Sequence, residues 1–282
     1  MSLGKTVLLG FIAGVTILLG LPIGRLKRSA PALRMVLNAI AVGVLMFLVW
    51  DVLSGAWEPI DAALGQFHRG DGGLAPAFGY GALFAGGLVV GLLSLVAYER
   101  WMDRLTRVPD LAGQAPPRSG LASWSPARRL ALLIAVGIGL HNFAEGLAIG
   151  QSAASGEIAL ATLLVIGFAL HNATEGFGIV APLAADTGND DPGAIPSWAF
   201  LLSLGAIGGG PTVIGTVVGH AVTSEALSVT FLTLAAGSML YVIIQLVSVS
   251  ARTRRMDLLA YGLLIGLLAG FVTDAIVTAA GV

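Results

Sequence analysis

The sequence contains no cysteine and few charged residues. The absence of cysteine among 282 residues excludes disulfides, iron–sulfur clusters and thiolate metal sites. Lys, Arg, Asp and Glu together make up only 11% of the chain, which is too little charge to cover the surface of a soluble domain. The formal net charge of -1 argues against a nucleic-acid partner, because phosphate binding requires clustered excess Lys and Arg.

The residues that are present are mostly apolar. Hydrophobic residues make up 56% of the chain and the mean hydropathy is +0.89, values typical of an integral membrane protein whose main partner is the lipid bilayer. Windows of about 20 residues cross a hydrocarbon core of ~30 Å. The chain offers eight such windows, at residues 5–24, 35–56, 78–99, 128–150, 158–183, 196–219, 226–249 and 258–280. We predict that the first, which lacks a cleavage site, is retained as a span.

The basic residues predict how the spans are oriented. All of the 15 lysines and arginines except Lys5 and Arg69 lie in three connections that share one side of an eight-span chain. By the positive-inside rule this side is cytoplasmic, so both termini are predicted to be extracytoplasmic. One of these connections, 100–127, is rich in Pro, Gly and Ser and is predicted to be a cytoplasmic linker. We therefore expect an all-α, polytopic protein with one transmembrane domain, 1–282, in the plasma (cell inner) membrane.

Two copies of one polar pattern interrupt the apolar sequence. HNFAEG begins at His141 and HNATEG begins at His171, in the fourth and fifth predicted spans. Residues three and four apart share a face of a helix, so the His, Asn and Glu of each copy project toward a common side near mid-membrane. The two spans are joined by the short segment QSAASGE and are predicted to be antiparallel neighbours.

These polar faces are predicted to bind a metal ion. A carboxylate at the bilayer centre costs about 2.5 to 3.5 kcal/mol, and a cation between the two helices would offset that cost. A lone buried His or Asn is more often interhelical glue, but glue does not explain a pattern that occurs twice. The predicted ligands are His141, Asn142, Glu145, His171, Asn172 and Glu175.

The ligand chemistry narrows the choice of ion. Imidazole disfavours magnesium and calcium, and the absence of thiolate disfavours Cu(I), which leaves zinc, iron, manganese and cadmium. The repeated pattern also predicts an inverted repeat whose ligands converge at mid-membrane. Two further acids, Asp51 and Asp274, lie in the second and eighth spans and are candidate residues of the ion pathway.

At the two motifs the chain resembles the ZIP (Zrt/Irt-like) family of divalent metal transporters. The resemblance implies eight spans, extracytoplasmic termini, a homodimer, and a bundle containing the fourth and fifth helices that moves against the remaining ones. It also implies that His141 and Glu145 bind the first ion, that Asn142 serves a neighbouring second site, and that Glu175 bridges the two. His171 and Asn172 occupy the matching positions of helix five.

The chain departs from the family pattern at several positions. Ala144 and Thr174 replace the proline that is usual in HNxPEG, so we expect straighter helices. The family often has Glu-Pro in helix six, and alignment through Pro211 puts Gly210 where that acid would be. Gln245, another candidate pathway residue, stands where a glutamate is common. We therefore expect one tightly held metal per protomer, with any second ion weak, and we expect Gly210→Glu to add a ligand.

Two other functions share some of these features. An intramembrane metal-dependent hydrolase also buries His and acidic ligands, but the motifs lack the general-base glutamate of HExxH and have Asn142 or Asn172 in its place. A passive cation channel would need a ring of carbonyls or acids around a pore. The expected function is transport of divalent transition metals, zinc first, with the metal as substrate and with no organic cofactor.

Overall fold

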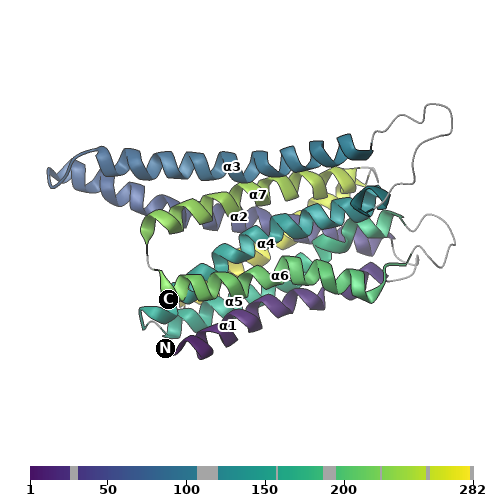
Figure 1. Cartoon of the computed structure of the whole chain (residues 1–282), viewed down its shortest axis with the longest axis horizontal. Coiled ribbons are helices and arrows are strands. Elements are labelled where there is room, and N and C mark those ends of the chain that lie inside the picture. Colours follow the sequence, from purple (N-terminus) through teal and green to yellow (C-terminus); the bar gives the residue numbers. More distant parts are fainter. Residues whose placement is uncertain are drawn as a thin grey trace.

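The computed structural model describes residues 1–25, 31–106, 120–156, 158–186, 195–222, 224–251 and 255–279. Within these ranges the regular structure is helical and includes eight helices long and apolar enough to cross a membrane, which confirms the predicted all-α membrane class. The elements are α1 (Leu3–Val15), the 3-10 turns η1 (Thr16–Leu19) and η2 (Leu21–Arg25), α2 (Pro31–Arg69), α3 (Ala75–Thr106), η3 (Gly120–Ser123), α4 (Pro126–Ala154), α5 (Ile158–Asp186), α6 (Trp198–Ala221), α7 (Glu225–Ala251) and α8 (Met256–Ala279) (Figure 1).

Local sequence explains where several helices start and stop. The Ser125 hydroxyl accepts a hydrogen bond of 3.3 Å from the Arg128 amide at the start of α4, and Pro126 stands at the first helical position. Ser197 caps α6 in the same way. These caps satisfy amides that have no partner within the helix. After α2, Gly70 takes a positive φ of 79° that disfavours other residues and allows the chain to reverse.

The α2–α3 hairpin is longer than the hydropathy windows. Helix α2 continues past residue 56 to Arg69, and α3 continues to Thr106, into the predicted linker. Of the rest of that linker, 107–119 lies outside the described residues, and 120–127 contains η3 and the start of α4. The tip of this hairpin extends beyond the ends of the other helices in Figure 1. Hydropathy marks where a chain leaves lipid, but a helix satisfies its own backbone in water too and need not end there.

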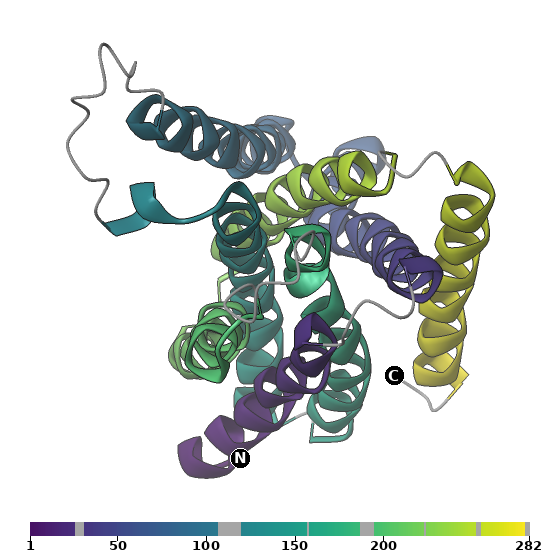
Figure 2. The same ribbon diagram turned by 90° about the vertical axis from the view of Figure 1, so that its right-hand side faces the viewer.

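The helices pack as two groups. The α4 group contains α1, α4, α5 and α6, with its largest contact between α4 and α6. The α7 group contains α2, α3, α7 and α8, with its largest contacts between α2 and α8 and between α3 and α7. Seen end-on in Figure 2, α3 and α8 lie at the periphery, while α4 contacts α7 and α5 contacts α2 across the boundary between the groups.

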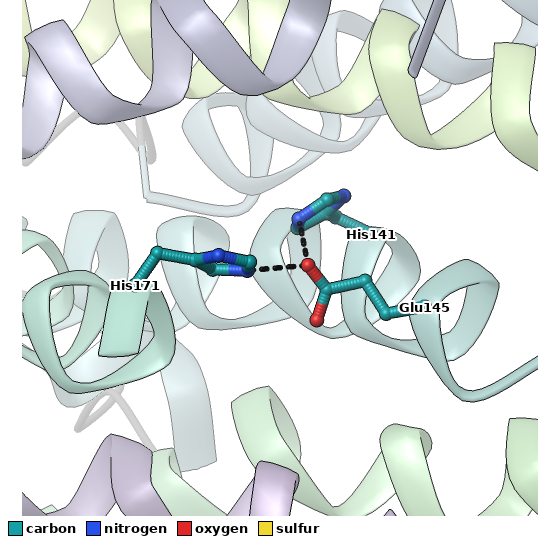
Figure 3. Close-up of side chains that lie close together, drawn as sticks. All are labelled: His141, Glu145 and His171. Carbon is teal, nitrogen blue, oxygen red and sulfur yellow. Dashed lines mark hydrogen bonds and ion pairs between the residues drawn. The ribbon is translucent and has the colours of Figure 1, made fainter. Parts of the chain in front are cut away.

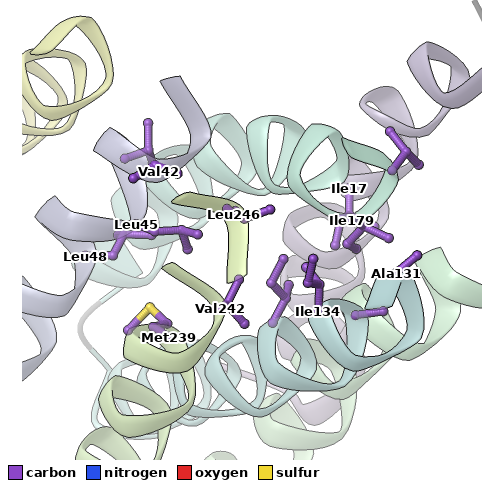
Figure 4. Close-up of a cluster of buried hydrophobic side chains, with 14 of the residues drawn as sticks. Ile17, Val42, Leu45, Leu48, Ala131, Ile134, Ile179, Met239, Val242 and Leu246 are labelled. Carbon is purple, nitrogen blue, oxygen red and sulfur yellow. The ribbon is translucent and has the colours of Figure 1, made fainter. Parts of the chain in front are cut away.

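A shared apolar core joins the two groups. It includes Ile134 of α4, Ile179 of α5 and Val242 of α7, all fully buried, together with Val42 and Leu45 of α2 (Figure 4). In lipid these contacts contribute through close packing rather than through a hydrophobic driving force. They hold the middle of α4 and α5 at the centre of the molecule.

Candidate metal centre

Three side chains of the two motifs meet between α4 and α5. His141 and Glu145 lie one turn apart on α4, and His171 approaches from α5 (Figure 3). The Nε2 atom of His141 lies 2.8 Å from Glu145 Oε1, and Nε2 of His171 contacts the same oxygen. Both helices run unbroken through their motifs. The geometry therefore brings together imidazoles from two helices on one carboxylate oxygen.

Glu175 lies beside this group. Its Oε1 atom is 3.7 Å from Nε2 of His141. A zinc-like ion bonded at about 2.0–2.1 Å to tetrahedral ligands holds those ligands about 3.4 Å apart. The ligand atoms of His141, Glu145 and His171 all lie within 4.8 Å of one another, so small side-chain rotations suffice for one ion to bridge them. Glu175 is near enough to His141 to serve as a fourth ligand.

The group is almost completely enclosed. The side chains of His141, Glu145 and Glu175 are 1%, 4% and 1% exposed, and His171 is 12% exposed. In the described part of the chain, Oε2 of Glu145 and both carboxylate oxygens of Glu175 accept no hydrogen bond of ordinary geometry, although the Asn142 side chain lies close enough to interact with Glu175. Buried carboxylates without donors are costly. This donor set fits a divalent cation, whose charge would balance the two carboxylates.

The motif asparagines are anchored to neighbouring helices. Asn142 donates its amide to the Gly208 carbonyl of α6 at 2.9 Å, and Asn172 donates to the Ala13 carbonyl of α1 at 3.1 Å. Both residues are fully buried, and neither carboxamide oxygen has a partner among the described residues. Each asparagine thus ties its helix to a neighbouring helix.

Comparison with known proteins identifies the family to which this arrangement belongs. The model of the family described as "ZIP Zinc transporter" matches residues 110–277, which include both motifs. The chain belongs to the ZIP family. It is also 32% identical over 203 residues to "Zinc transporter ZupT" of Enterobacter sp. (strain 638), an alignment that covers 72% of this chain and 70% of that protein.

Family membership decides between the functions that the sequence left open. A ZIP protein with eight membrane-length helices is a multi-pass membrane transporter of divalent metal ions, and it is not an enzyme. The intramembrane hydrolase is therefore set aside. The metal ion is the transported substrate.

Gln245, a candidate pathway residue by its resemblance to ZIP proteins, lies in the contact between α3 and α7. Its amide nitrogen donates to Glu99 Oε1 at 3.1 Å and to the Tyr241 hydroxyl at 2.8 Å, while Tyr241 donates to the other Glu99 oxygen. We therefore assign Gln245 to the packing of these two helices. The sequence analysis did not identify Glu99. This residue is the last one of the apolar window 78–99, where a charged side chain normally lies in the polar interface of the membrane.

Gly210 does not lie where the ZIP alignment through Pro211 led us to expect. A side chain at Gly210 would meet nothing within 4 Å, and Ile214, one turn further along the same face, is 60% exposed. Residues of α6 that contact the motifs include Gly208, whose carbonyl accepts from Asn142, and Thr212, whose carbonyl lies against Gly146. We therefore no longer expect Gly210→Glu to add a ligand, because residues two apart on a helix point about 200° apart.

Asp51 and Asp274 lie on α2 and α8 in the α7 group. Asp51 is within electrostatic range of Asp274 and of both motif histidines. The preceding residue, Trp50, packs on Phe271 of α8 with ring centroids 5.3 Å apart. The fold therefore places these two acids, from spans far apart in the sequence, within electrostatic range of each other.

Proposed function

We propose that this protein transports divalent transition-metal ions, zinc first and then iron, manganese or cadmium, through a mid-membrane site between α4 and α5. One observation carries the proposal: Glu145 Oε1 faces imidazoles from both helices in an enclosed group beside a second carboxylate. An all-nitrogen and oxygen donor set without thiolate suits zinc and its neighbours. The printed name of the Enterobacter relative, a zinc transporter, supports zinc as the first candidate.

In this proposal His141, Glu145, His171 and Glu175 bind the tightly held ion. Two carboxylates neutralise one divalent ion but not two, and unbalanced charge is costly at low dielectric. The unpartnered oxygens of Asn142 and Asn172 complete the polar lining and supply the weak second site. The protein then holds one tight ion per protomer.

Transport requires the two helix groups to move relative to each other, because the site side chains are enclosed. The packing supports such a motion. Within the α4 group a Cβ on Gly146 would lie 2.1 Å from the Thr212 carbonyl oxygen, so these helices touch backbone to backbone. Across the boundary, a Cβ on Gly137 would first meet the methyl end of Val242, at 2.6 Å. Side-chain contacts of this kind reform more readily than interlocked backbones.

We propose that the helices form an inverted repeat, as many transporters do. Asn142 links α4 to α6 and Asn172 links α5 to α1 through the same type of hydrogen bond. Gly14 and Gly209 meet each other reciprocally, since a Cβ on either would lie 2.3 or 2.2 Å from the carbonyl oxygen of the other. These paired contacts are what a pseudo-two-fold axis between α1 and α6 would produce.

The remaining features follow from the basic loops and from the family resemblance. We propose one transmembrane domain, extracytoplasmic termini, a homodimer and location in the plasma membrane, with Asp51 and Asp274 guiding ions to the site. Labelling of a tag after Val282 from outside intact cells tests this orientation. A tag that reacts only after the cells are opened would reverse it.

Uptake of zinc by purified protein in liposomes tests the transport proposal. We expect uptake that saturates with zinc concentration and is inhibited by cadmium, since a carrier binds one ion per cycle. Uptake that rises linearly with concentration would favour the passive channel. An absence of zinc, iron, manganese and cadmium uptake by folded protein would reject the proposal.

A further inference from the structure

The chain crosses between the two helix groups at the connection of α6 and α7. Helix α6 ends at Ala221 in the α4 group, and α7 begins at Glu225 in the α7 group. Only residues 222–224 lie between them, of which Thr223 is outside the described part. The four Cα–Cα steps from Ala221 to Glu225 span at most about 15 Å whatever their conformation. Any motion between the groups must therefore keep these two helix ends close.

Gln151, in the last turns of α4, spans this crossing. Its amide nitrogen donates to the Val222 carbonyl at the end of α6, at 3.4 Å, and to the Ser228 hydroxyl on α7, at 3.2 Å. The same hydroxyl donates to Gln151 Oε1 at 3.2 Å. One carboxamide thus holds the chain on both sides of the three-residue link.

Both sides of the link are anchored within their own groups. The Val222 amide donates to the Val218 carbonyl at 2.9 Å, which continues the backbone bonding of α6. On the other side the Tyr80 hydroxyl of α3 donates to Glu225 Oε2 at 2.9 Å, which ties the first turn of α7 to its group. The bonds between Gln151 and Ser228 therefore connect two separately fixed ends.

From Gln151 toward the N-terminal end of α4, the antiparallel helices α4 and α7 contact each other along one face of each helix. Phe143 packs on Phe231 with ring centroids 4.9 Å apart, and the Ser238 hydroxyl donates to the Gly137 carbonyl at 3.1 Å. Phe231 and Ser238 are seven residues apart and share a face of α7, with Ala235 between them. Opening at the Gln151 end would separate these faces and expose Ala235, which is fully buried.

We propose that Gln151 and Ser228 form a latch that holds α4 against α7 at this end of the molecule. The proposal rests on the proposed transport function, in which the two groups move relative to each other. A hydroxyl–carboxamide contact suits this role because it breaks at modest cost and its groups then bond water at the membrane surface. The short link keeps the helix ends in register for the latch to close again.

Thiol labelling of the cysteine-free chain tests the latch. With Ala235→Cys as the only thiol, the purified protein is placed in nanodiscs, where both faces are accessible, and is exposed to a membrane-impermeant thiol reagent. Loss of a net hydrogen bond shifts an equilibrium by about 2- to 10-fold, so Gln151→Ala should raise the labelling rate by that factor. Ser228→Ala should raise it equally, and the double variant should show no further increase because the partners share one interaction.

Ser248→Ala is the matched control, because that serine lies on the same helix and, among the described residues, its hydroxyl bonds to the Ile244 carbonyl of its own helix. Its labelling rate should equal that of the Ala235→Cys protein. Unchanged rates in both latch variants, or effects that add in the double variant, would overturn the proposal. Labelling needs no metal, so the result is separate from the uptake test: an absence of uptake of all four metals together with the expected labelling rates would reject the function alone.

Discussion

Glu145→Gln is the substitution that should affect metal binding most. The change keeps the shape of the side chain and removes one of two negative charges, at the oxygen that both imidazoles face. Removing one partner of a buried charged interaction costs about 3–5 kcal/mol. At 1.4 kcal/mol per tenfold, this corresponds to a zinc Kd raised roughly 100- to 5,000-fold. Glu175→Gln should cost less, because Glu175 faces only His141, at 3.7 Å.

Calorimetry of zinc binding and thermal unfolding of the purified proteins measure this effect. Zinc at 100 times the wild-type Kd should stabilise the wild type by about 2.7 kcal/mol, and Glu145→Gln should lose that stabilisation. Without zinc the variant and the wild type should be closer in stability, because the carboxamide oxygen that replaces Glu145 Oε1 can still accept hydrogen bonds from the two imidazoles. Glu58→Gln, on the exposed part of α2, is the control. A Kd within threefold of the wild type for Glu145→Gln, or an equal loss in Glu58→Gln, would refute the reasoning.

Two further predictions follow from the glycines. Gly146→Ala should lower the free energy of unfolding by about 1–3 kcal/mol, because its Cβ would lie 2.1 Å from the Thr212 carbonyl oxygen. Thermal unfolding measures this, with Gly81→Ala as the control. A Cβ at Gly81 meets nothing within 4 Å, so this variant should leave the Tm unchanged or slightly raised. Gly210→Glu should leave the number of bound metal ions per protomer unchanged by elemental analysis, since this position faces away from the motifs, and a rise toward two would restore the original alignment.

Composition and pattern were enough to predict the membrane class and the central motifs. A long apolar segment in lipid forms a helix, because a helix pairs its own backbone N–H and C=O groups by hydrogen bonds. The eight apolar windows therefore predicted eight helices. The spacing of His, Asn and Glu placed them on one face because helical periodicity is a local property. The convergence of His141 and Glu145 with His171 followed from two adjacent antiparallel spans.

Tertiary contacts decided what local pattern could not. Gln245 was a candidate pathway residue by resemblance, and nothing in the local pattern around Asn38 indicates its partners. In the structure the Gln245 amide donates to Glu99 and to the Tyr241 hydroxyl. The Asn38 amide donates to the Leu246 carbonyl and to the Ser250 hydroxyl. Which neighbour faces a side chain depends on how helices far apart in the sequence are rotated and paired.

The sequence by itself therefore determined that the protein lies in lipid, the number of membrane-length helices and the chemical identity of the polar groups in the fourth and fifth of them, because each depends on residues within a few turns of one another. Only the tertiary structure decided that Gly208 rather than Gly210 contacts the motifs, that each motif asparagine is anchored to a different helix, and that Gln151 spans the link between the two groups. These depend on helix rotation and on close backbone packing, which are set by many weak contacts across the whole bundle.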